Sequence, residues 1–336
     1  MQLMKGINLG GYLSQCKHGI QHYEAFIMRD DIRKIAKWGF DHVRLPIDYE
    51  VLETEDGKVK ESGYRYVMQV ADWCKAEGLN VIIDLHKAYG YDFNDAGNES
   101  KNTLFGDETL KKRFVDLWIQ IVKRFKNCAN VAFELLNEVV EKENAEAWNA
   151  LIKMTVEAIR KDAPSAPIIY GGIQWNSVKT LKLLEKPMDS NIIFTFHFYE
   201  PLLFTHQKAY WVKGMDRKAD IAYPQTKEYY VEGSKPLGYQ GEVVGKTKSA
   251  VMGKPFIREL ILEAVEAAKK AGVSLYCGEY GVIDQAPAED SLRWFQDVKA
   301  VFKEYNIGSA IWTYKEKDFG LAGNHYDSVR DQIIQC

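Results

Sequence analysis

The sequence contains only five cysteines among its 336 residues, and their spacing suggests no pairing. No CxxC motif occurs, the number is odd, and the positions are scattered: Cys16, Cys74, Cys128, Cys277 and Cys336. A zinc site would show closely spaced cysteines, and a disulfide framework would show an even number of them. Neither is indicated, so we expect free thiols in a reducing compartment.

The chain also lacks a strong charge of either sign and a long apolar run. Its formal net charge of −3 gives no reason to expect a nucleic-acid or acidic-membrane partner. No stretch reaches the ~20 apolar residues that span a bilayer. The opening MQLMKGINLGGYL has neither the apolar segment nor the cleavage site of a signal peptide. We expect a soluble, cytoplasmic monomer, while a secreted form with its leader removed stays open.

What the sequence does contain is a regular alternation of helix and strand patterns. Amphipathic stretches such as KKRFVDLWIQIVKRF, residues 111–125, place apolar side chains on one helical face. A Gly or Asn turn and a short apolar run then follow, as in AEGLNVIIDLH, residues 76–86. Strands are predicted at 6–9, 42–46, 80–86, 131–137, 167–172, 191–199, 273–279 and 309–314. Helices are predicted at 30–38, 63–77, 107–126, 145–161, 177–184, 256–271, 289–304 and 326–334.

Eight strand–helix units in a chain of this length predict an α/β fold, a (β/α)₈ TIM barrel that fills residues 1–336 as a single domain. A doubly wound sheet is the competing architecture, but no GxGxxG motif opens a helix after the first strand.

One connection is too long for a simple loop. Roughly 55 residues separate strand six from helix six, whereas such loops usually have ~2–6 residues. We predict a small inserted subdomain at 200–254, over the face where barrels carry their chemistry. An extra packing or dimerisation element is the alternative. The segment is rich in aromatic residues: Phe204, Tyr210, Trp211, Tyr223, Tyr229, Tyr230 and Tyr239.

Polar side chains stand where the predicted strands end. These are Arg44, His86, Asn137 with Glu138, His197 with Tyr199, Glu279 and Trp312. The carboxyl ends of barrel strands meet at one rim, so the residues should converge on one opening. An ordinary barrel would have to satisfy each group at a cost in free energy. The pattern therefore predicts an active site at this rim.

Two of these residues are carboxylates, Glu138 and Glu279, which stand three strand–helix units apart and face each other. Cleavage of a glycosidic bond needs such a pair, an acid for the leaving oxygen and a nucleophile or water-activating base. Arg44 and the Tyr199 hydroxyl are suited to hold a carboxylate ionised, whereas a carboxyl in an apolar niche keeps its proton. The residues alone leave open which glutamate plays which part.

The same motifs resemble glycoside hydrolase family 5: VRLP, DLH, NE, HFY, GEYG and IWTY. The resemblance covers essentially the whole chain, and HFYEPLLFTHQKAYW is similar to clostridial and rumen-type endoglucanases of that family. It implies a retaining double displacement with Glu138 as general acid/base and Glu279 as nucleophile. It also implies supporting residues: Asn137 on the sugar 2-hydroxyl, His86 on other hydroxyls, His197 beside Glu138, Arg44 and Tyr199 on Glu279, and Trp312 under the sugar ring.

The predicted substrate is an internally cut β-1,4-glucan, of cellulose type or mixed linkage. β-Mannan or glucomannan, or a multi-specific hemicellulase activity, is the alternative. Trp175 and Trp211 are candidates for outer sugar subsites. Lys87, directly after His86, is predicted to be a solvated surface lysine rather than a sugar contact.

Functions outside hydrolysis fit less well. A sugar-binding barrel without catalysis would not need Glu138 and Glu279 together with Arg44 and Tyr199. A metal-dependent hydrolase could use histidines and glutamates as ligands, but the first strand region, GINLGG, has no ligand. A barrel aldolase would need a supported strand-end lysine. Because two carboxylates suffice for the chemistry, no metal or cofactor is expected.

Overall fold

The computed structural model describes all residues 1–336 and confirms the predicted barrel. Parallel strands close on themselves in the order β1-β10-β9-β6-β5-β4-β3-β2. They are β1 (Lys5–Asn8), β2 (His42–Asp48), β3 (Asn80–Lys87), β4 (Val131–Glu134), β5 (Ile168–Gly171), β6 (Ile192–Phe198), β9 (Ser274–Tyr280) and β10 (Gly308–Ile311).

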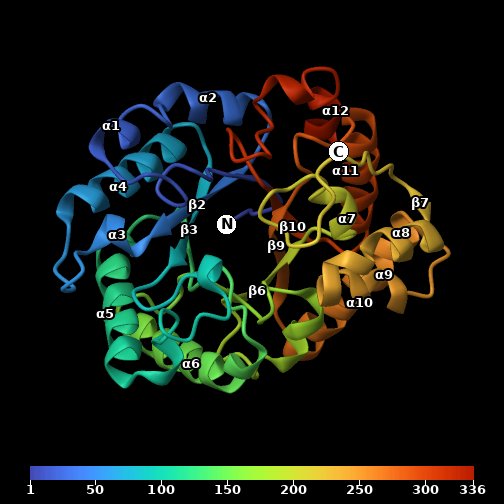
Figure 1. The fold of residues 1–336 in the computed structure, drawn as a ribbon. Coiled ribbons are helices and arrows are strands. Elements are labelled where there is room, and N and C mark those ends of the chain that lie inside the picture. The colour runs from blue at the N-terminus through green and yellow to red at the C-terminus, as the bar shows by residue number, and fades with distance from the viewer.

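A ring of helices surrounds the barrel (Figure 1). Its members are α2 (Arg29–Lys37), α4 (Glu61–Ala76), α5 (Glu108–Phe125), α6 (Ala145–Asp162), α10 (Lys254–Ala271), α11 (Ala288–Glu304) and α12 (Arg330–Gln335), with short α1 (Ile20–Tyr23) and α3 (Tyr49–Leu52). The helix predicted at 177–184 forms as a 3₁₀ helix, η4 (Val178–Leu183), rather than as an α-helix, and it ends where the backbone becomes extended at Leu184. None of the helices is both long and apolar enough to cross a membrane.

Apolar side chains form two separate clusters. The larger one holds 90 buried residues and includes outward-facing strand residues such as Val43 and Leu45 together with the apolar faces of the helices. The smaller one has five residues, which line one level of the barrel lumen: Ile82, Ala132, Ile169, Tyr276 and Ala310. The split follows from the pleat, since alternate residues of a barrel strand face the lumen and the helices.

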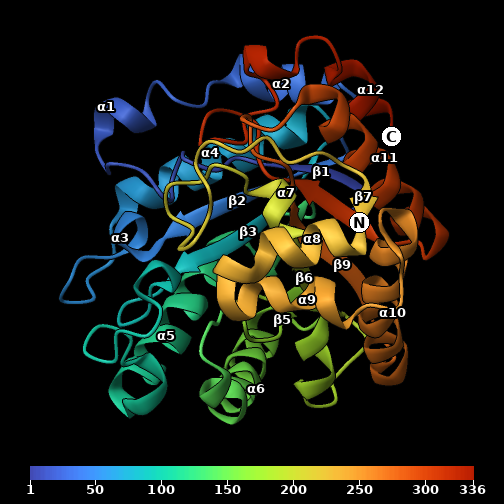
Figure 2. The same ribbon diagram turned by 45° about the vertical axis from the view of Figure 1, so that its right-hand side comes forward.

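The segment between β6 and α10 contains most of the extra structure. Its elements are α7 (Leu202–Thr205), β7 (Gln225–Thr226), α8 (Lys227–Ser234), the 3₁₀ helix η5 (Lys235–Gly241), α9 (Glu242–Lys246) and β8 (Val251–Met252). β7 and β8 pair antiparallel outside the barrel. Figures 1 and 2 show α8 and α9 near α10, with α7 closer to the barrel strands. That residues 200–254 act as a subdomain stays a prediction.

Candidate active site

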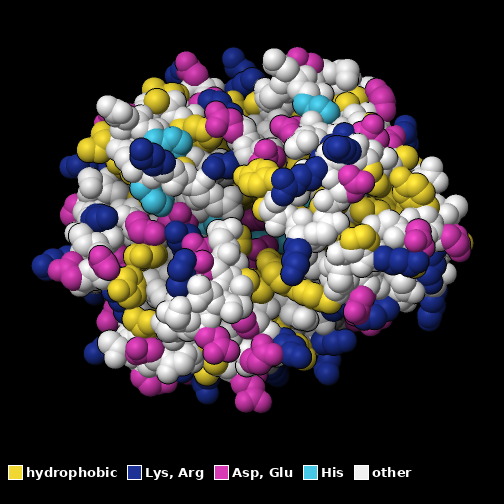
Figure 3. Space-filling model, in the orientation of Figure 1, with side chains coloured by type: hydrophobic (Ala, Val, Ile, Leu, Met, Phe, Trp, Pro, Cys, Tyr) yellow, Lys and Arg dark blue, Asp and Glu magenta, His cyan; other side chains and the backbone are white.

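The barrel opening is hollowed at its centre, and acidic and histidine side chains lie at the bottom of the hollow (Figure 3). Most of the predicted site residues are buried there, with exposed fractions of 8% or less: Arg44, His86, Asn137, Glu138, His197, Glu279 and Trp312. Tyr199 is partly buried beside them. The structure thus brings together residues from six of the eight barrel strands or the loops that follow them.

Two predicted strand ends need correction. Arg44 lies inside β2 rather than at its end, because β2 stays paired with β3 as far as Asp48. Asn137 and Glu138 lie beyond β4, whose ladder with β5 ends at Glu134. The apolar run continues for two residues after the ladder stops, so the composition alone placed the strand end too late. The Asn137 N–H still donates to the carbonyl of Leu85 on β3, at 3.1 Å.

Arg44 connects the buried acids. Its Nη1 donates to Glu279 Oε1 at 2.8 Å, and its Nε and Nη2 donate to the two oxygens of Glu134 at 2.8 and 3.0 Å. Nη2 also donates to Asn137 Oδ1 at 2.9 Å and lies 3.1 Å from Asp84 Oδ2. One guanidinium therefore faces three carboxylates. Burial, together with the charges of Asp84 and Glu279, raises the pKa of Glu134 to about 7 despite Arg44.

Both oxygens of Glu279 accept hydrogen bonds. Arg44 binds Oε1, and the Tyr199 hydroxyl donates to Oε2 at 2.9 Å. Burial and the charge of Glu279 raise the pKa of Tyr199 well above its usual range, so Tyr199 remains a donor. Hydrogen bonds to a carboxylate favour its charged form. Glu279 is therefore held as a nucleophile would be.

Glu138 has a different environment. Burial raises its pKa to about 7, and burial lowers the pKa of His197 to about 4. His197 is thus neutral at pH 7, and its Nδ1 lies 2.7 Å from Glu138 Oε1. This hydrogen bond fixes the position of the Glu138 carboxyl, which burial keeps partly protonated at that pH. This is the arrangement of a general acid.

The two glutamates lie close together. Three atoms all lie within 4.8 Å of one another: a carboxylate oxygen of Glu138, a carboxylate oxygen of Glu279 and a ring nitrogen of His197. Retaining glycosidases separate their carboxyl groups by ~5–5.5 Å and inverting ones by ~6.5–9.5 Å. The spacing fits retention. These atoms also have the chemistry of metal ligands, but they already bind each other and Tyr199, and the Arg44 charge beside Glu279 opposes a cation.

His86 and Trp312 face each other across the other part of the opening. Their rings are parallel within 4°, with centroids 5.8 Å apart. His86 Nδ1 lies 2.7 Å from Asp84 Oδ2, and its Nε2 lies 3.2 Å from Gln15 Nε2. Burial opposes a charge on His86, but Asp84 outweighs it and raises the pKa. A polar ring edge beside an indole face suits a sugar ring.

The two outer tryptophans lie apart from this group. Trp211 is 45% exposed and contacts the rings of His206 and Phe319, with centroids 6.2 and 6.5 Å away. Trp175 is partly buried and stacks on Tyr239 of the inserted segment, with centroids 5.8 Å apart. Neither tryptophan is hydrogen-bonded to Glu138 or Glu279.

Sequence reasoning missed four polar residues of the site: Asn8, Gln15, Asp84 and Glu134. Glu134 left a signal, since it is the first of three polar residues in the apolar run VAFELLNEVV, residues 131–140. The prediction for Lys87 is wrong. Its ammonium lies 3.1 Å from Glu50 and 3.3 Å from Asp92, and its side chain is only 19% exposed.

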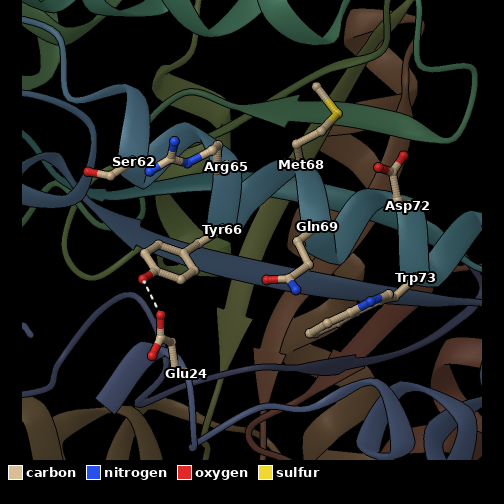
Figure 4. Close-up of a pocket in the computed structure, with 8 residues that line it drawn as sticks. All are labelled: Glu24, Ser62, Arg65, Tyr66, Met68, Gln69, Asp72 and Trp73. Atoms are coloured by element: carbon tan, nitrogen blue, oxygen red, sulfur yellow. Dashed lines mark hydrogen bonds between the residues drawn. The ribbon is translucent and has the colours of Figure 1, made fainter. Parts of the chain in front are cut away.

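A second groove, of about 470 Å³, lies on the outer surface between α1 and α4 (Figure 4). It is lined by Glu24, Ser62, Arg65, Tyr66, Met68, Gln69, Asp72 and Trp73. Its two acids are exposed, so it offers no buried carboxylate pair. The candidate catalytic groups therefore lie in the barrel opening and not in this groove.

A TIM barrel with two close, unlike carboxylates and a sugar-sized aromatic face defines a class, the two-carboxylate glycosidases. The comparisons with known proteins identify the family. The profile of cellulase (glycosyl hydrolase family 5) matches residues 5–318, and the chain belongs to this family.

Relatives match over nearly the whole chain. Endoglucanase C of Acetivibrio thermocellus is 38% identical over 337 residues, covering 98% of this chain and 96% of that enzyme. Cellodextrinase A of Ruminococcus flavefaciens is 39% identical over 306 residues, covering 91% and 83%. The crystal structure of Thermotoga maritima Cel5A with mannotriose is 27% identical, with a TM-score of 0.76 and coverage of 99% and 96%. The predicted family is confirmed.

Proposed function

We propose that the protein is a retaining endo-β-1,4-glucanase in which Glu138 is the general acid/base and Glu279 the nucleophile. The observation that carries the proposal is the difference between two neighbouring buried glutamates. Arg44 and Tyr199 hydrogen-bond both oxygens of Glu279, whereas burial keeps a proton on part of the Glu138 population at pH 7. Acid and nucleophile are thus distinguished before substrate binds.

The reaction proceeds in two displacements. Glu279 attacks the anomeric carbon while Glu138 gives its proton to the departing glycosidic oxygen, which leaves a covalent glycosyl-enzyme. Glu138, now a carboxylate, takes a proton from water as the water attacks the same carbon and releases Glu279. The Asn137 amide, beside Glu138, supplies a donor for the sugar 2-hydroxyl. Trp312 and His86 bind the ring of the same sugar.

The substrate is assigned from the relatives. Two of them are named as an endoglucanase and a cellodextrinase, which supports a β-1,4-glucan or its oligosaccharides as the substrate of this chain. Glucomannan is the second candidate, because Thermotoga maritima Cel5A has been crystallised with both cellobiose and mannotriose. A monomeric state and a cytoplasmic location stay predictions.

The test is release of reducing sugar from carboxymethylcellulose, mixed-linkage β-glucan, glucomannan and xylan. We expect the wild type to cut a β-glucan fastest and Glu279→Gln to lose about 10⁴-fold or more in kcat. Glu24→Gln, the same change at an exposed glutamate, is the matched control and should keep full activity. Wild-type inactivity on all four polymers, or an active Glu279→Gln, would contradict the proposal. Preferential cutting of glucomannan would move the substrate to the second candidate.

A further inference from the structure

Tyr199, whose hydroxyl binds the candidate nucleophile, lies just beyond the end of its strand. β6 ends at Phe198, so Tyr199 is outside the strand ladder. Its hydroxyl nevertheless donates to Glu279 Oε2 at 2.9 Å. Hydrogen bonds weaken steeply when their distance or angle departs from the optimum. Contacts outside the ladder must therefore hold the Tyr199 side chain in place.

The first turn of the inserted segment supplies such contacts through Thr205, the last residue of α7. The Thr205 hydroxyl donates to the carbonyl of Tyr199 at 2.5 Å. The Thr205 carbonyl accepts the N–H of Ile283 at 2.9 Å, and Ile283 lies in the loop after β9, the strand of Glu279. Thr205 is fully buried. One residue thus joins the backbone of the tyrosine to the loop that follows the nucleophile.

His206, the next residue, contacts both Thr205 and the ring of Tyr199. Its Nδ1 lies 3.1 Å from Thr205 Oγ1. Because the single hydroxyl hydrogen of Thr205 goes to a carbonyl, which can only accept, the imidazole Nδ1 carries the ring proton and donates. Burial lowers the pKa of His206 to about 3, so the ring is neutral at pH 7. The ring packs edge-on against that of Tyr199, with centroids 4.9 Å apart and planes at 80°.

Phe319, in the loop after β10, contacts the same two rings. Its centroid lies 6.0 Å from that of Tyr199 and 5.3 Å from that of His206. Phe319 is itself buried. Close packing of this kind restricts how far a ring can move. The tyrosine ring is therefore confined by side chains from two other parts of the chain.

We propose that Thr205 and His206 are positioning residues, which act through Tyr199 to hold Glu279 in the orientation in which it attacks the anomeric carbon. The inserted segment thus contributes to the reaction through its first turn. The inference rests on the proposed function, since it takes Glu279 as the nucleophile.

The step that these residues affect is the first displacement. A carboxylate oxygen of Glu279 bonds to the anomeric carbon while the bond to the leaving oxygen breaks, and the electron pair leaves with that oxygen. With a glucan the leaving oxygen takes the proton of Glu138, whereas dinitrophenolate leaves as an anion without a proton. Both kinds of substrate need the nucleophile, and only the glucan needs the acid. Poor positioning of Glu279 should therefore lower the rate equally on both.

The experiment measures kcat/KM of Thr205→Val and Thr205→Ser on cellopentaose and on dinitrophenyl β-cellobioside. Valine keeps nearly the same shape and loses the hydroxyl, so we expect kcat/KM to fall about 5- to 30-fold on both substrates, as for coupled residues in contact. Serine keeps the hydroxyl and should restore activity close to wild type. These values are taken per folded molecule.

Thr155→Val is the matched control. Thr155 is as buried as Thr205, and its hydroxyl also donates to a backbone carbonyl, that of Leu151 in α6, at 2.7 Å. The substitution therefore removes the same kind of hydrogen bond away from the opening. It should leave kcat/KM per folded molecule unchanged on both substrates.

A double-mutant cycle separates positioning from a general effect on the fold. In a Tyr199→Phe background the hydroxyl on which Thr205 acts is gone, so adding Thr205→Val should lower kcat/KM by less than about twofold more. If Thr205→Val does not fold, His206→Ala, at a partly exposed position, provides the same cycle. It should lower kcat/KM on both substrates and have little further effect beside Tyr199→Phe.

Three results would overturn the inference: losses that multiply in the double variants, an unchanged Thr205→Val enzyme, or a loss confined to cellopentaose. A Tyr199→Phe enzyme with wild-type activity would also overturn it, because nothing would remain for Thr205 to act through. If the wild type cleaves neither substrate, or Glu279→Gln matches it, the proposed function itself fails. The two failures are thus separate results.

Discussion

The lumen of the barrel has two levels that differ sharply in chemistry although they share the same strands. On β3, Ile82 belongs to the apolar lumen cluster, while Asp84, two residues further, lies in the ionic group around Arg44. On β4 the same step leads from Ala132 to Glu134. Two residues along a strand cover about 7 Å. The lumen thus changes from hydrocarbon to buried charge over that distance.

Under the proposed function, the apolar level serves stability and the ionic level serves catalysis. Apolar lumen residues stabilise the fold by leaving water. Burying an arginine with three carboxylates has a desolvation cost that ion pairs only partly offset, and a packed apolar layer would be easier to stabilise. The ionic level holds Glu279 and Asn137 in place through Arg44, which is what the proposed reaction needs.

The strongest test of this difference between the two levels is to substitute one residue on each. Arg44→Met leaves buried carboxylates without their cation, so we expect a loss of about 3–5 kcal/mol in the free energy of unfolding and about 10³-fold or more in kcat. Ile82→Ala should lose about 2–5 kcal/mol, while its folded fraction keeps kcat within twofold. Urea unfolding followed by tryptophan fluorescence, with kcat on cellopentaose, measures both. A fully active Arg44→Met would show that the ionic level is not catalytic.

The second prediction separates the two glutamates that meet at the upper level. Glu138→Ala removes the acid, so cleavage of cellopentaose should fall about 10²- to 10⁴-fold. Formation of the glycosyl-enzyme from dinitrophenyl β-cellobioside needs no acid and should fall far less. Added azide, a nucleophile that needs no base, should then speed turnover of the aryl substrate. Equal losses of activity on both substrates, with no effect of azide, would mean that Glu138 is not the general acid/base.

A third prediction concerns pH. Burial raises the pKa of Glu138 to about 7, and the acid must be protonated to act. The kcat/KM for cellopentaose should therefore decrease as pH rises through about 7, approaching roughly tenfold per pH unit above it. On dinitrophenyl β-cellobioside this decrease should be absent or shifted to higher pH, because no proton is donated. A profile for cellopentaose that is flat from pH 6 to 8 would contradict the assignment.

The sequence predicted the polar residues that follow apolar runs, but it did not predict the buried groups that bind them. The polar residues that end apolar runs, such as Glu138 and Glu279, are visible because burial of a carboxylate is rare without a reason. Asp84 and Glu134 were missed because single polar residues inside a strand also occur on solvent-facing strands. The ion pairs of Lys87 were missed because Glu50 comes from the neighbouring strand–helix unit. The stacking of Tyr239 on Trp175 joins positions 64 apart, which no local pattern reports.

Contacts between distant positions also occur at the lower level of the lumen, and the smallest of the predicted changes in stability concerns one of them. His42 sits at the amino end of the lumen with its Nε2 2.8 Å from the Tyr276 hydroxyl, and its ring occupies the place that a side chain at Gly6 would need. Tyr276→Phe removes one buried hydrogen bond, so we expect a loss of about 1 kcal/mol in the free energy of unfolding and unchanged kcat and KM. Urea unfolding and cellopentaose kinetics test this together. A Tyr276→Phe enzyme with altered kcat would mean that the two levels are coupled, and that the lower level also positions Arg44.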